Sequence, residues 1–250
     1  KKLVSDVYRT IMRQKLLFMQ APTGVGKTIS TIFPAVKAVG EELADRIFYL
    51  TAKTITATVA KETFALLEKN GYRAKTIQIT AKEKLCPCDE MECNPVTCPY
   101  AKGHFDRVND AVFDLLHRCE MIERDDILSQ ADRYTVCPFE LCLDTASWCD
   151  NVICDYNYVF DPNVYLKRFF QEGIKGDYIF LIDEAHNMVE RSRQMYSAQI
   201  YKEDFLTVKR IMKEHSRSIE KALEKCNKIL LGMKRECENY TVYDTFGNMV

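Results

Sequence analysis

Short apolar runs alternate along the chain with segments in which apolar residues recur every three or four positions. A short apolar run that stops at a polar turn is typical of a buried parallel strand. The spacing of three and four predicts helices over residues 28–39, 54–69 and 187–196. Strands that alternate with helices predict an α/β fold with a parallel sheet. The predicted strands cover residues 15–21, 46–52, 74–80, 151–160 and 177–185.

Residues 85–148 interrupt this alternation, because they contain no strand-like apolar run. Phe105, Val108, Val112 and Leu115 are spaced by three and four, which predicts one face of a helix. Residues 85–140 contain few strand-forming residues, and we expect them to bury little apolar surface by themselves. Metal–ligand bonds could then supply folding energy that a small core lacks.

A second change of pattern begins near residue 201. Apolar residues follow steps of three and four from there, and neither Gly nor Pro occurs in residues 202–231. The pattern predicts one long amphipathic helix or a helical pair with a coiled-coil-like seam. A plain helix that faces a core explains it equally well.

Composition excludes two classes of protein. No apolar run reaches the roughly 18 residues of a membrane span, and the N-terminal KKLVSDVYRTIMRQK is charged and helical in pattern, unlike a signal segment. The net charge of −1 neither favours nor excludes a nucleic-acid partner, since a local basic groove is sufficient. Eleven cysteines form an odd number, which does not suit a disulfide framework. We therefore expect a soluble, cytoplasmic protein with reduced thiols, several of them on a metal.

The sequence APTGVGKT, residues 21–28, follows the phosphate-loop pattern G-x-x-x-x-G-K-[ST] with Ala21 in place of the first glycine. Glycines allow the loop to curl so that its backbone N–H groups face a phosphate chain. Lys27 can reach the β- and γ-phosphates, the Thr28 hydroxyl can bind Mg²⁺, and the following helix directs its positive end at the same anion. The residues expected to bind ATP are Thr23, Gly24, Val25, Gly26, Lys27 and Thr28.

The sequence YIFLIDEAH predicts a strand with Asp183 and Glu184 at its carboxyl end. Ligands of open α/β sheets bind at this end of the strands. Asp183 can therefore hold Mg²⁺, and Glu184 can orient and deprotonate the attacking water. Lys27 and these two acids are the candidate groups for hydrolysis of the γ-phosphate.

These motifs resemble those of a known family. APTGVGKT and DEAH are similar to motifs I and II of superfamily-two helicases, and FYLTAKT (48–54) is similar to their motif Ia. A cysteine-rich insertion between motifs Ia and II resembles that of the XPD/DinG-like iron–sulfur helicases. CPYAKGHFDRVNDA, VCPFEL and ICDYNYVFDP resemble the bacterial branch of that family. The resemblance implies a RecA-like motor domain and 5′-to-3′ translocation on DNA, single-stranded or forked, driven by ATP and Mg²⁺.

The thiols between residues 84 and 107 admit two kinds of site. On spacing alone, a [4Fe–4S] cluster and a zinc ion, each held by four thiolates, are about equally favoured. The resemblance implies the cluster, with Cys86, Cys93, Cys98 and Cys137 as ligands. Cys88 is an additional thiol that could replace Cys86 or Cys93. Six other cysteines are expected to act as small core residues: Cys119, Cys142, Cys149, Cys154, Cys226 and Cys237.

The resemblance also implies DNA contacts and a domain plan. Thr51 and Lys53 of motif Ia correspond to phosphate contacts, and His186 of DEAH couples the nucleotide state to DNA binding. Tyr156 and Tyr158 either stack on bases or, as we favour, pack in the core. The plan places motor domain 1 at residues 1–84 and 141–199, the cluster insertion at 85–140 and the start of a helical Arch domain at 200–250.

The second motor domain of the family is not recognisable in this sequence, so we expect a fragment that binds ATP weakly and hydrolyses it poorly. A phosphate-loop kinase or GTPase would carry a base-specific motif such as N-K-x-D, which is not found. Two alternatives stay open: a metal-binding module without helicase activity, and a helicase that carries zinc in place of the cluster.

Overall fold

The computed structural model describes residues 1–22, 24–52 and 54–241. The chain divides into two compact units, Lys1–Tyr196 and Ser197–Val250. Each unit is described by itself below.

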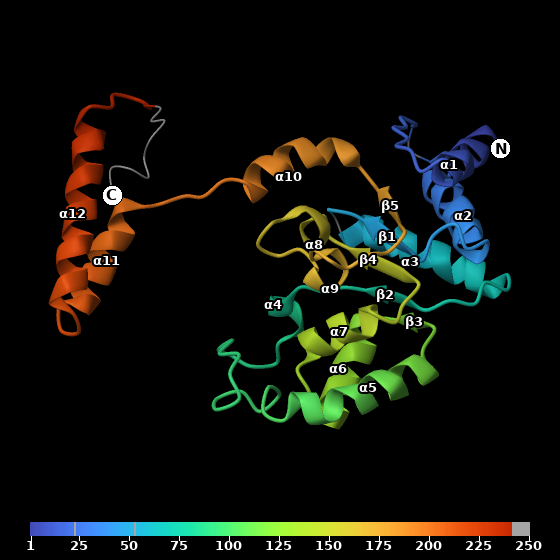
Figure 1. Ribbon diagram of the computed structural model, residues 1–250, viewed down its shortest axis with the longest axis horizontal. Helices are drawn as coiled ribbons and strands as arrows, with labels where there is room; N and C mark the ends of the chain where they lie inside the picture. Colours follow the sequence, from blue (N-terminus) through green and yellow to red (C-terminus); the bar gives the residue numbers. More distant parts are fainter. Residues whose placement is uncertain (23, 53, 242–250) are drawn as a thin grey trace. The chain divides into compact units, whose positions relative to one another are not determined.

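A parallel sheet forms the centre of the first unit (Figure 1). Its five strands lie in the order β3-β2-β4-β1-β5, and every neighbouring pair is parallel. The central β1 aligns Ile47 with Asn151 on one side and with Ile179 on the other. The predicted α/β fold with a parallel sheet is confirmed. The strands are β1 (Arg46–Leu50), β2 (Thr76–Gln78), β3 (Met121–Ile122), β4 (Asn151–Cys154) and β5 (Tyr178–Ile182).

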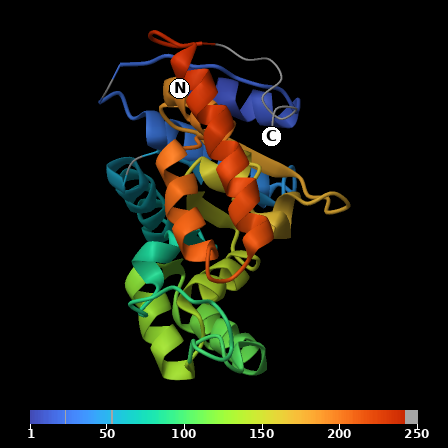
Figure 2. The ribbon, with the colours of Figure 1, turned by 90° about the vertical axis from the view of Figure 1, so that its left-hand side faces the viewer.

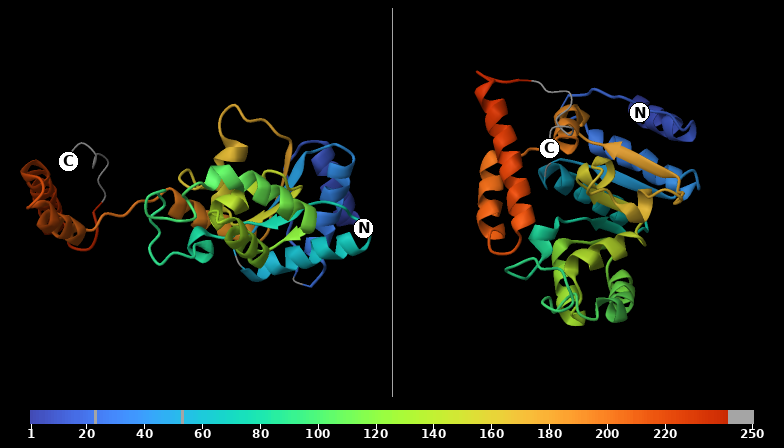
Figure 3. Two further views of the ribbon diagram at one scale, coloured as in Figure 1. Left: turned by 90° about the horizontal axis from the view of Figure 1, so that it is seen from below. Right: turned by 60° about the vertical axis from the view of Figure 1, so that its left-hand side comes forward.

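Two helices cover one face of the sheet, and a third packs on them (Figure 3). Alternate residues of a strand point to opposite faces, so Ile47 and Tyr49 of β1 lie on the same side. There they join Ile32 and Phe64 in one buried apolar cluster. The helices are α2 (Lys27–Gly40) and α3 (Thr54–Lys69), with α1 (Lys2–Met12) packed against α2.

The opposite face carries the larger apolar cluster, with Phe48 of β1 fully buried at its centre. The Phe48 ring contacts those of Phe169, Phe170, Tyr178 and Phe180, with centroid distances of 5.1–5.5 Å. These rings hold the sheet to the segment between β4 and β5. The helices on this side are α4 (Lys82–Leu85), α5 (His104–Arg118), α6 (Arg124–Tyr134), α7 (Pro138–Ala146), α8 (Asn157–Phe160) and α9 (Lys167–Phe170).

The segment 85–148 contributes more to this core than its sequence suggested. Val108, Val112 and Leu115 of α5 are buried in the same cluster as Phe48, and β3 extends the sheet at its edge. The helices of the segment share the core of the sheet, so the expectation that residues 85–140 bury little by themselves stays a prediction. Phe105, expected on the buried face of its helix, is 86% exposed.

The strand expected over residues 15–21 is not formed. Residues 15–22 have no regular secondary structure, and Leu16 and Phe18 are 87% and 88% exposed. A strand needs a hydrogen-bonded neighbour. Among the described residues, β5 is an edge strand of the sheet, and β1 is the strand that pairs with it. An apolar run shows that a segment could be buried, but it does not show whether the segment pairs with an edge strand of the sheet.

The strand expected over residues 151–160 is shorter than predicted. β4 ends at Cys154, and a helical turn, α8, follows from Asn157. Tyr156 and Tyr158 are both buried, so the core interpretation of these rings is confirmed. Among the six cysteines expected in the core, Cys142, Cys149 and Cys154 are buried, and the other three are half-buried.

The second unit contains a helical pair, α11 (Lys202–Met212) and α12 (Arg217–Arg235), that lies antiparallel (Figure 2). The Ser216 side chain accepts a hydrogen bond from the Ile219 N–H at 3.5 Å and starts α12 as its N-cap. The helical-pair alternative is thus the correct one. In the described part of the chain, no helix is both long enough and apolar enough to cross a membrane.

Replacement of Phe48 tests the aromatic core. Phe48→Ala removes a fully buried ring, and we expect the free energy of unfolding to fall by about 3–5 kcal/mol. Denaturant unfolding followed by circular dichroism measures the change. The control Phe105→Ala removes an exposed ring and should change stability by less than about 0.5 kcal/mol. Equal losses in the two variants would contradict this description of the core.

Candidate functional site

The carboxyl ends of the three adjacent strands β4, β1 and β5 carry the motifs identified in the sequence. Thr51 directly follows β1, Tyr156 lies just after β4, and Asp183 directly follows β5. The Asp183 N–H donates to the Leu50 carbonyl oxygen at 3.0 Å, which extends the ladder between β1 and β5 by one more bond. Parallel pairing therefore brings these three segments to one edge of the sheet.

The phosphate-loop sequence ends at the start of α2, a helix of 14 residues. Gly24 and Gly26 have φ values of +82° and +74°, a backbone region that favours glycine, and Gly26 is the N-cap of α2. The Lys27 ammonium donates to the Ala21 carbonyl oxygen at 3.3 Å and so closes the loop on itself. An anion could take over this lysine and the free N–H groups of the first helical turn.

The acidic motif forms a tight turn after β5. Glu184 has φ +50°, and its N–H donates to Asp183 Oδ1 at 3.0 Å. The buried Tyr156 hydroxyl donates to the carbonyl oxygens of Asp183 and Glu184, the latter at 3.2 Å. His186 Nδ1 lies 3.3 Å from Glu184 Oε2. The side chain of Tyr156, which follows β4, therefore stabilises the turn.

Tyr49 lies on the face of the sheet that α2 covers. This buried residue of β1 points to the α2 side of the sheet. Burial raises the pKa of the Tyr49 phenol, as does the charge of Asp183, whereas an interaction with Thr28 lowers this pKa. Helix α2 begins at Lys27 and packs on β1 and β5, so Thr28 and Asp183 are the side chains that could share Mg²⁺ at this edge.

The residues expected to contact DNA are only partly described. Thr51 is 5% exposed, and its hydroxyl contacts the hydroxyl of Thr56 at the start of α3. Lys53 and the expected nucleotide contact Thr23 lie outside the described residues. The role of Thr51 in DNA binding stays a prediction.

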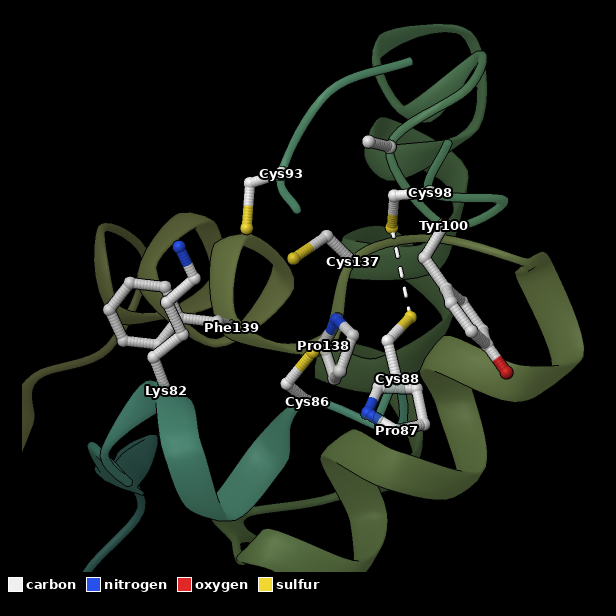
Figure 4. A pocket seen from close by; sticks show the side chains of 11 residues that line it. Lys82, Cys86, Pro87, Cys88, Cys93, Cys98, Tyr100, Cys137, Pro138 and Phe139 are labelled. Carbon is white, nitrogen blue, oxygen red and sulfur yellow. Dashed lines mark hydrogen bonds between the residues drawn. The ribbon is translucent and has the colours of Figure 1, made fainter. Parts of the chain in front are cut away.

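The thiols gather around a cavity of about 30 Å³ (Figure 4). The four expected ligands line it, although Cys137 is far from the others in the sequence, and so does Cys88. Cys88 Sγ and Cys98 Sγ lie 4.0 Å apart. Among the described residues, no three His, Cys, Asp or Glu side chains are arranged to hold one metal ion. The thiols thus surround a space without converging on one point.

Charge around the cavity favours an anionic group. The Lys82 side chain also lines the cavity, and a hydrogen bond with the Cys93 thiol raises the pKa of Lys82. Burial and the neighbouring thiol of Cys98 raise the pKa of Cys88 to about 11. Burial raises the pKa of Cys137 as well. A metal must therefore displace thiol protons as it binds.

Sequence reasoning did not identify Tyr49, Lys82 or the supporting role of Tyr156. Tyr49 lies within the predicted strand 46–52, and its alternation with Phe48 indicates that it faces the other side of the sheet. Nothing in the sequence marks the other two, because their partners lie in distant segments.

Comparison with known families is consistent with this geometry. The sequence profile of the DEAD_2 family matches residues 59–205, which is more than half of the 250-residue chain. The chain belongs to the DEAD_2 family. The match extends from α3, across the cysteine-rich segment and the acidic turn, into α11.

Two curated proteins are similar to this DEAD_2 chain. The General transcription and DNA repair factor IIH helicase subunit XPD/RAD3 of Saccharomyces cerevisiae is 23% identical over 217 residues, which cover 73% of this chain and 28% of the yeast protein. The Fanconi anemia group J protein homolog of Gallus gallus is 29% identical over 76 residues, 30% of this chain and 6% of that protein. The chain thus spans less than a third of the length of either relative.

Two solved structures have a similar fold. The structure titled Truncated XPD has a TM-score of 0.60 at 17% identity and covers 98% of this chain and 71% of its own. The structure titled XPD_Helicase has a TM-score of 0.58 at 16% identity and covers 98% and 43%. The DEAD_2 chain therefore has an XPD-like helicase-domain fold.

Replacement of Tyr156 tests the support of the acidic turn. Tyr156→Phe removes the hydroxyl that binds two carbonyl oxygens of the turn, and we expect amide hydrogen exchange over residues 183–188 to become about tenfold faster. Mass spectrometry of the corresponding peptides measures the rate. Tyr196→Phe, at an exposed tyrosine, serves as the control. An unchanged rate in Tyr156→Phe would show that the turn does not depend on this hydroxyl.

Proposed function

We propose that this DEAD_2 chain is the ATP-binding part of a DNA helicase or translocase with 5′-to-3′ polarity, from the bacterial branch of the XPD/DinG-like iron–sulfur helicases. The packing of α2, which begins at Lys27, on β1 and β5 carries this proposal, together with the position of Asp183 at the carboxyl end of the ladder between these two strands. This arrangement supports a single site for the phosphate loop and the acidic turn. The printed names of the yeast relative and of the XPD structures support a helicase function.

The proposed reaction is hydrolysis of the γ-phosphate of ATP. The phosphates lie at the loop formed by Thr23, Gly24, Val25 and Gly26, where the positive end of α2 stabilises them. Lys27 leaves the Ala21 carbonyl and binds the β- and γ-oxygens. Thr28 and Asp183 hold Mg²⁺, which neutralises charge on those oxygens.

Glu184 is the proposed general base. Its carboxylate orients the attacking water and accepts a proton from it. The Tyr156 hydroxyl bonds to the carbonyl oxygens of Asp183 and Glu184 and so stabilises the left-handed backbone that carries this side chain. His186 lies beside Glu184 and is proposed to transmit the nucleotide state to the DNA-binding surface.

DNA, single-stranded or forked, is the proposed polymer substrate. Thr51 and Lys53 are the proposed phosphate contacts, and Thr51 follows β1 at the same edge of the sheet. The main-chain bond from the Thr51 N–H to the Cys154 carbonyl oxygen, 3.0 Å, fixes the start of this segment. Thr51 presents little side-chain surface, so the larger share of phosphate attraction is assigned to Lys53.

The thiol cavity is the proposed site of a [4Fe–4S] cluster with Cys86, Cys93, Cys98 and Cys137 as ligands. Its donor set fits, because five thiols line it and a lysine offsets negative charge. A cluster binds each thiolate at a different iron, so the ligands need not converge on one point, whereas zinc requires four ligands at about 2.3 Å from one centre. Cys86, Cys93, Cys98 and Cys137 would hold the cluster, which would supply bonds that fix the irregular segment 86–101, and this segment is proposed to help separate DNA strands.

A domain plan completes the proposal. Motor domain 1 comprises residues 1–84 and 141–199, the cluster insertion comprises 85–140, and a helical Arch domain begins in 200–250. The first unit and the helical pair of the second are compatible with this plan. Because the chain spans 28% of the yeast relative, duplex separation is assigned to a larger protein, and this chain alone should hydrolyse ATP poorly.

Two alternatives make different predictions. A metal-binding module with a purely structural phosphate loop would not bind ATP. A zinc-containing helicase would bind ATP but would contain neither iron nor sulfide. The close approach of Cys88 Sγ and Cys98 Sγ, 4.0 Å, is the observation that favours zinc, since it is near the separation of two thiolates on one ion.

Nucleotide titration tests the ATP site. We expect the wild-type chain to bind ATP and Lys27→Ala to lower the affinity at least about tenfold, because it removes a charged contact with the phosphates. Asp183→Asn should abolish the increase in affinity that Mg²⁺ causes, with little effect on Mg²⁺-free binding. Titration calorimetry with and without Mg²⁺ measures both effects.

Lys15→Ala is the matched control, since Lys15 is an exposed lysine before the loop. Its affinity should equal that of the wild type. Failure of the wild-type chain to bind ATP would favour the metal-binding module, and strong DNA-stimulated hydrolysis by these 250 residues would contradict the assignment of activity to a larger protein.

Metal analysis tests the thiol site. Protein purified without air should be brown, absorb at about 400 nm and contain iron and sulfide. Cys93→Ser should remove most of the iron, because serine is a poor ligand for the cluster, while Cys88→Ser should retain it. Cys226→Ser in the second unit is the control. Zinc without sulfide in the wild type would replace the cluster proposal by the zinc alternative.

A further inference from the structure

His104 is a buried histidine that the proposed function does not use. It begins α5, directly after Gly103 with φ +66°, and is 4% exposed. Its Nδ1 atom accepts a hydrogen bond from the backbone N–H of Cys137 at 3.2 Å. The two residues are 33 positions apart in the sequence, so tertiary structure alone creates this bond.

The bond determines which nitrogen carries the ring proton. Because Nδ1 accepts a hydrogen bond, the proton of the neutral ring resides on Nε2. Nε2 is buried and has no hydrogen-bond partner among the described residues. Asp144 Oδ2 lies 3.8 Å from it. The carboxylate therefore attracts the N–H across a distance too long for a hydrogen bond and favours this ring orientation.

Asp144 is itself held in place. Its other oxygen, Oδ1, pairs with Arg168 of α9, and a second guanidinium nitrogen of Arg168 binds Glu140 at 2.6 Å. Glu140 and Asp144 lie one turn apart on α7, the helix whose N-cap is Cys137. A series of contacts runs from Arg168 through Asp144 and His104 to Cys137. It links the segment between β4 and β5 to one cysteine of the cavity.

We propose that His104 is a positioning residue that holds Cys137 at the thiol cavity through its backbone N–H, with Asp144 orienting the ring. The ligand set consists of two pieces, residues 86–98 and Cys137, that must meet for four thiolates to bind one group. His104 lies six residues after Cys98 and thereby ties the two pieces together before any metal is bound. Its importance for cluster binding rests on the function proposed above, whereas the hydrogen bond itself does not.

The proposal predicts that an acceptor at the place of Nδ1 is the essential feature. In asparagine, Oδ1 is the same number of bonds from Cα as Nδ1 is in histidine, so His104→Asn should keep the bond to Cys137. His104→Leu retains an apolar side chain of similar size but leaves the Cys137 N–H without an acceptor. His117→Leu is the matched control, because His117 lies exposed on the same helix and contacts the carbonyl oxygen and the ring of Phe113, one turn earlier.

The first measurement uses metal-free, reduced protein. The alkylation rates of individual cysteines are followed by peptide mass spectrometry. We expect Cys137 to react about tenfold faster in His104→Leu than in the wild type and at wild-type rates in His104→Asn and His117→Leu. Cys142 is the internal reference, since it is buried in α7 one turn further along. It should stay protected in every variant.

Three results would overturn the proposal: an unchanged Cys137 rate in His104→Leu, a fast rate in His104→Asn, or equal exposure of Cys142. The last would mean that His104 supports the whole of α7 and not the position of Cys137. None of these results depends on a cluster, so they decide the inference even if the cluster proposal fails.

The second measurement uses protein loaded anaerobically with iron and sulfide. Loss of absorbance after addition of a chelator should be about 10- to 100-fold faster in His104→Leu than in the wild type, as for other residues that orient metal ligands. His104→Asn should restore most of the lifetime. Equal lifetimes for all variants would overturn the role of His104 in cluster retention, whereas a wild-type protein that binds no iron would overturn the cluster and leave the thiol-reactivity result standing.

Discussion

The parallel pairing of β1 with β4 and β5 is the constraint on which the rest of the structure depends. In register along their whole length, these three strands end together, and the residues that follow them are confined to one edge of the sheet. Asp183 extends the ladder through its bond to Leu50, so the acidic turn cannot move independently of β1. The main chain therefore sets the geometry of the nucleotide site, and the side chains complete it.

Two buried tyrosines lie near this edge of the sheet. Tyr49 of β1 faces the side of the sheet that α2 covers, and Tyr156, just after β4, donates to the carbonyl oxygens of Asp183 and Glu184. Both phenols are buried, and burial raises the pKa of Tyr156 to about 12, so it stays a neutral donor at physiological pH. A neutral donor can bind carbonyl oxygens beside two carboxylates without adding charge repulsion.

Helix α7 connects the sheet to the thiol cavity. Its N-cap is Cys137. At its C-terminal end, the guanidinium of Arg46 from β1 donates to the carbonyl oxygens of Ala146 and Ser147 at 3.2 Å each. Those carbonyls have no partner within the helix, so a cation there is favourable. One thiol of the cavity is thus held by a helix that is anchored in the central strand, while Cys93 belongs to an exposed loop.

Local chemistry made much of this protein predictable from its sequence. The alternation of apolar runs and amphipathic segments indicated a parallel α/β sheet, and glycine, lysine, threonine and acidic residues at set spacings marked the two nucleotide motifs. Crowded thiols in a polar segment indicated a metal site. Each of these signals arises from neighbours in the chain, which is why it can be read without a structure.

Contacts between distant segments decided the rest. The apolar run 15–21 predicted a strand, but residues 15–21 form none. Whether such a run pairs with an edge strand depends on contacts with that strand and not on the run alone. Segment 85–148 proved rich in buried residues because its helices share a core with Phe48. The surroundings of Tyr49, Lys82 and His104 come from segments elsewhere in the chain, which only the folded chain brings beside them.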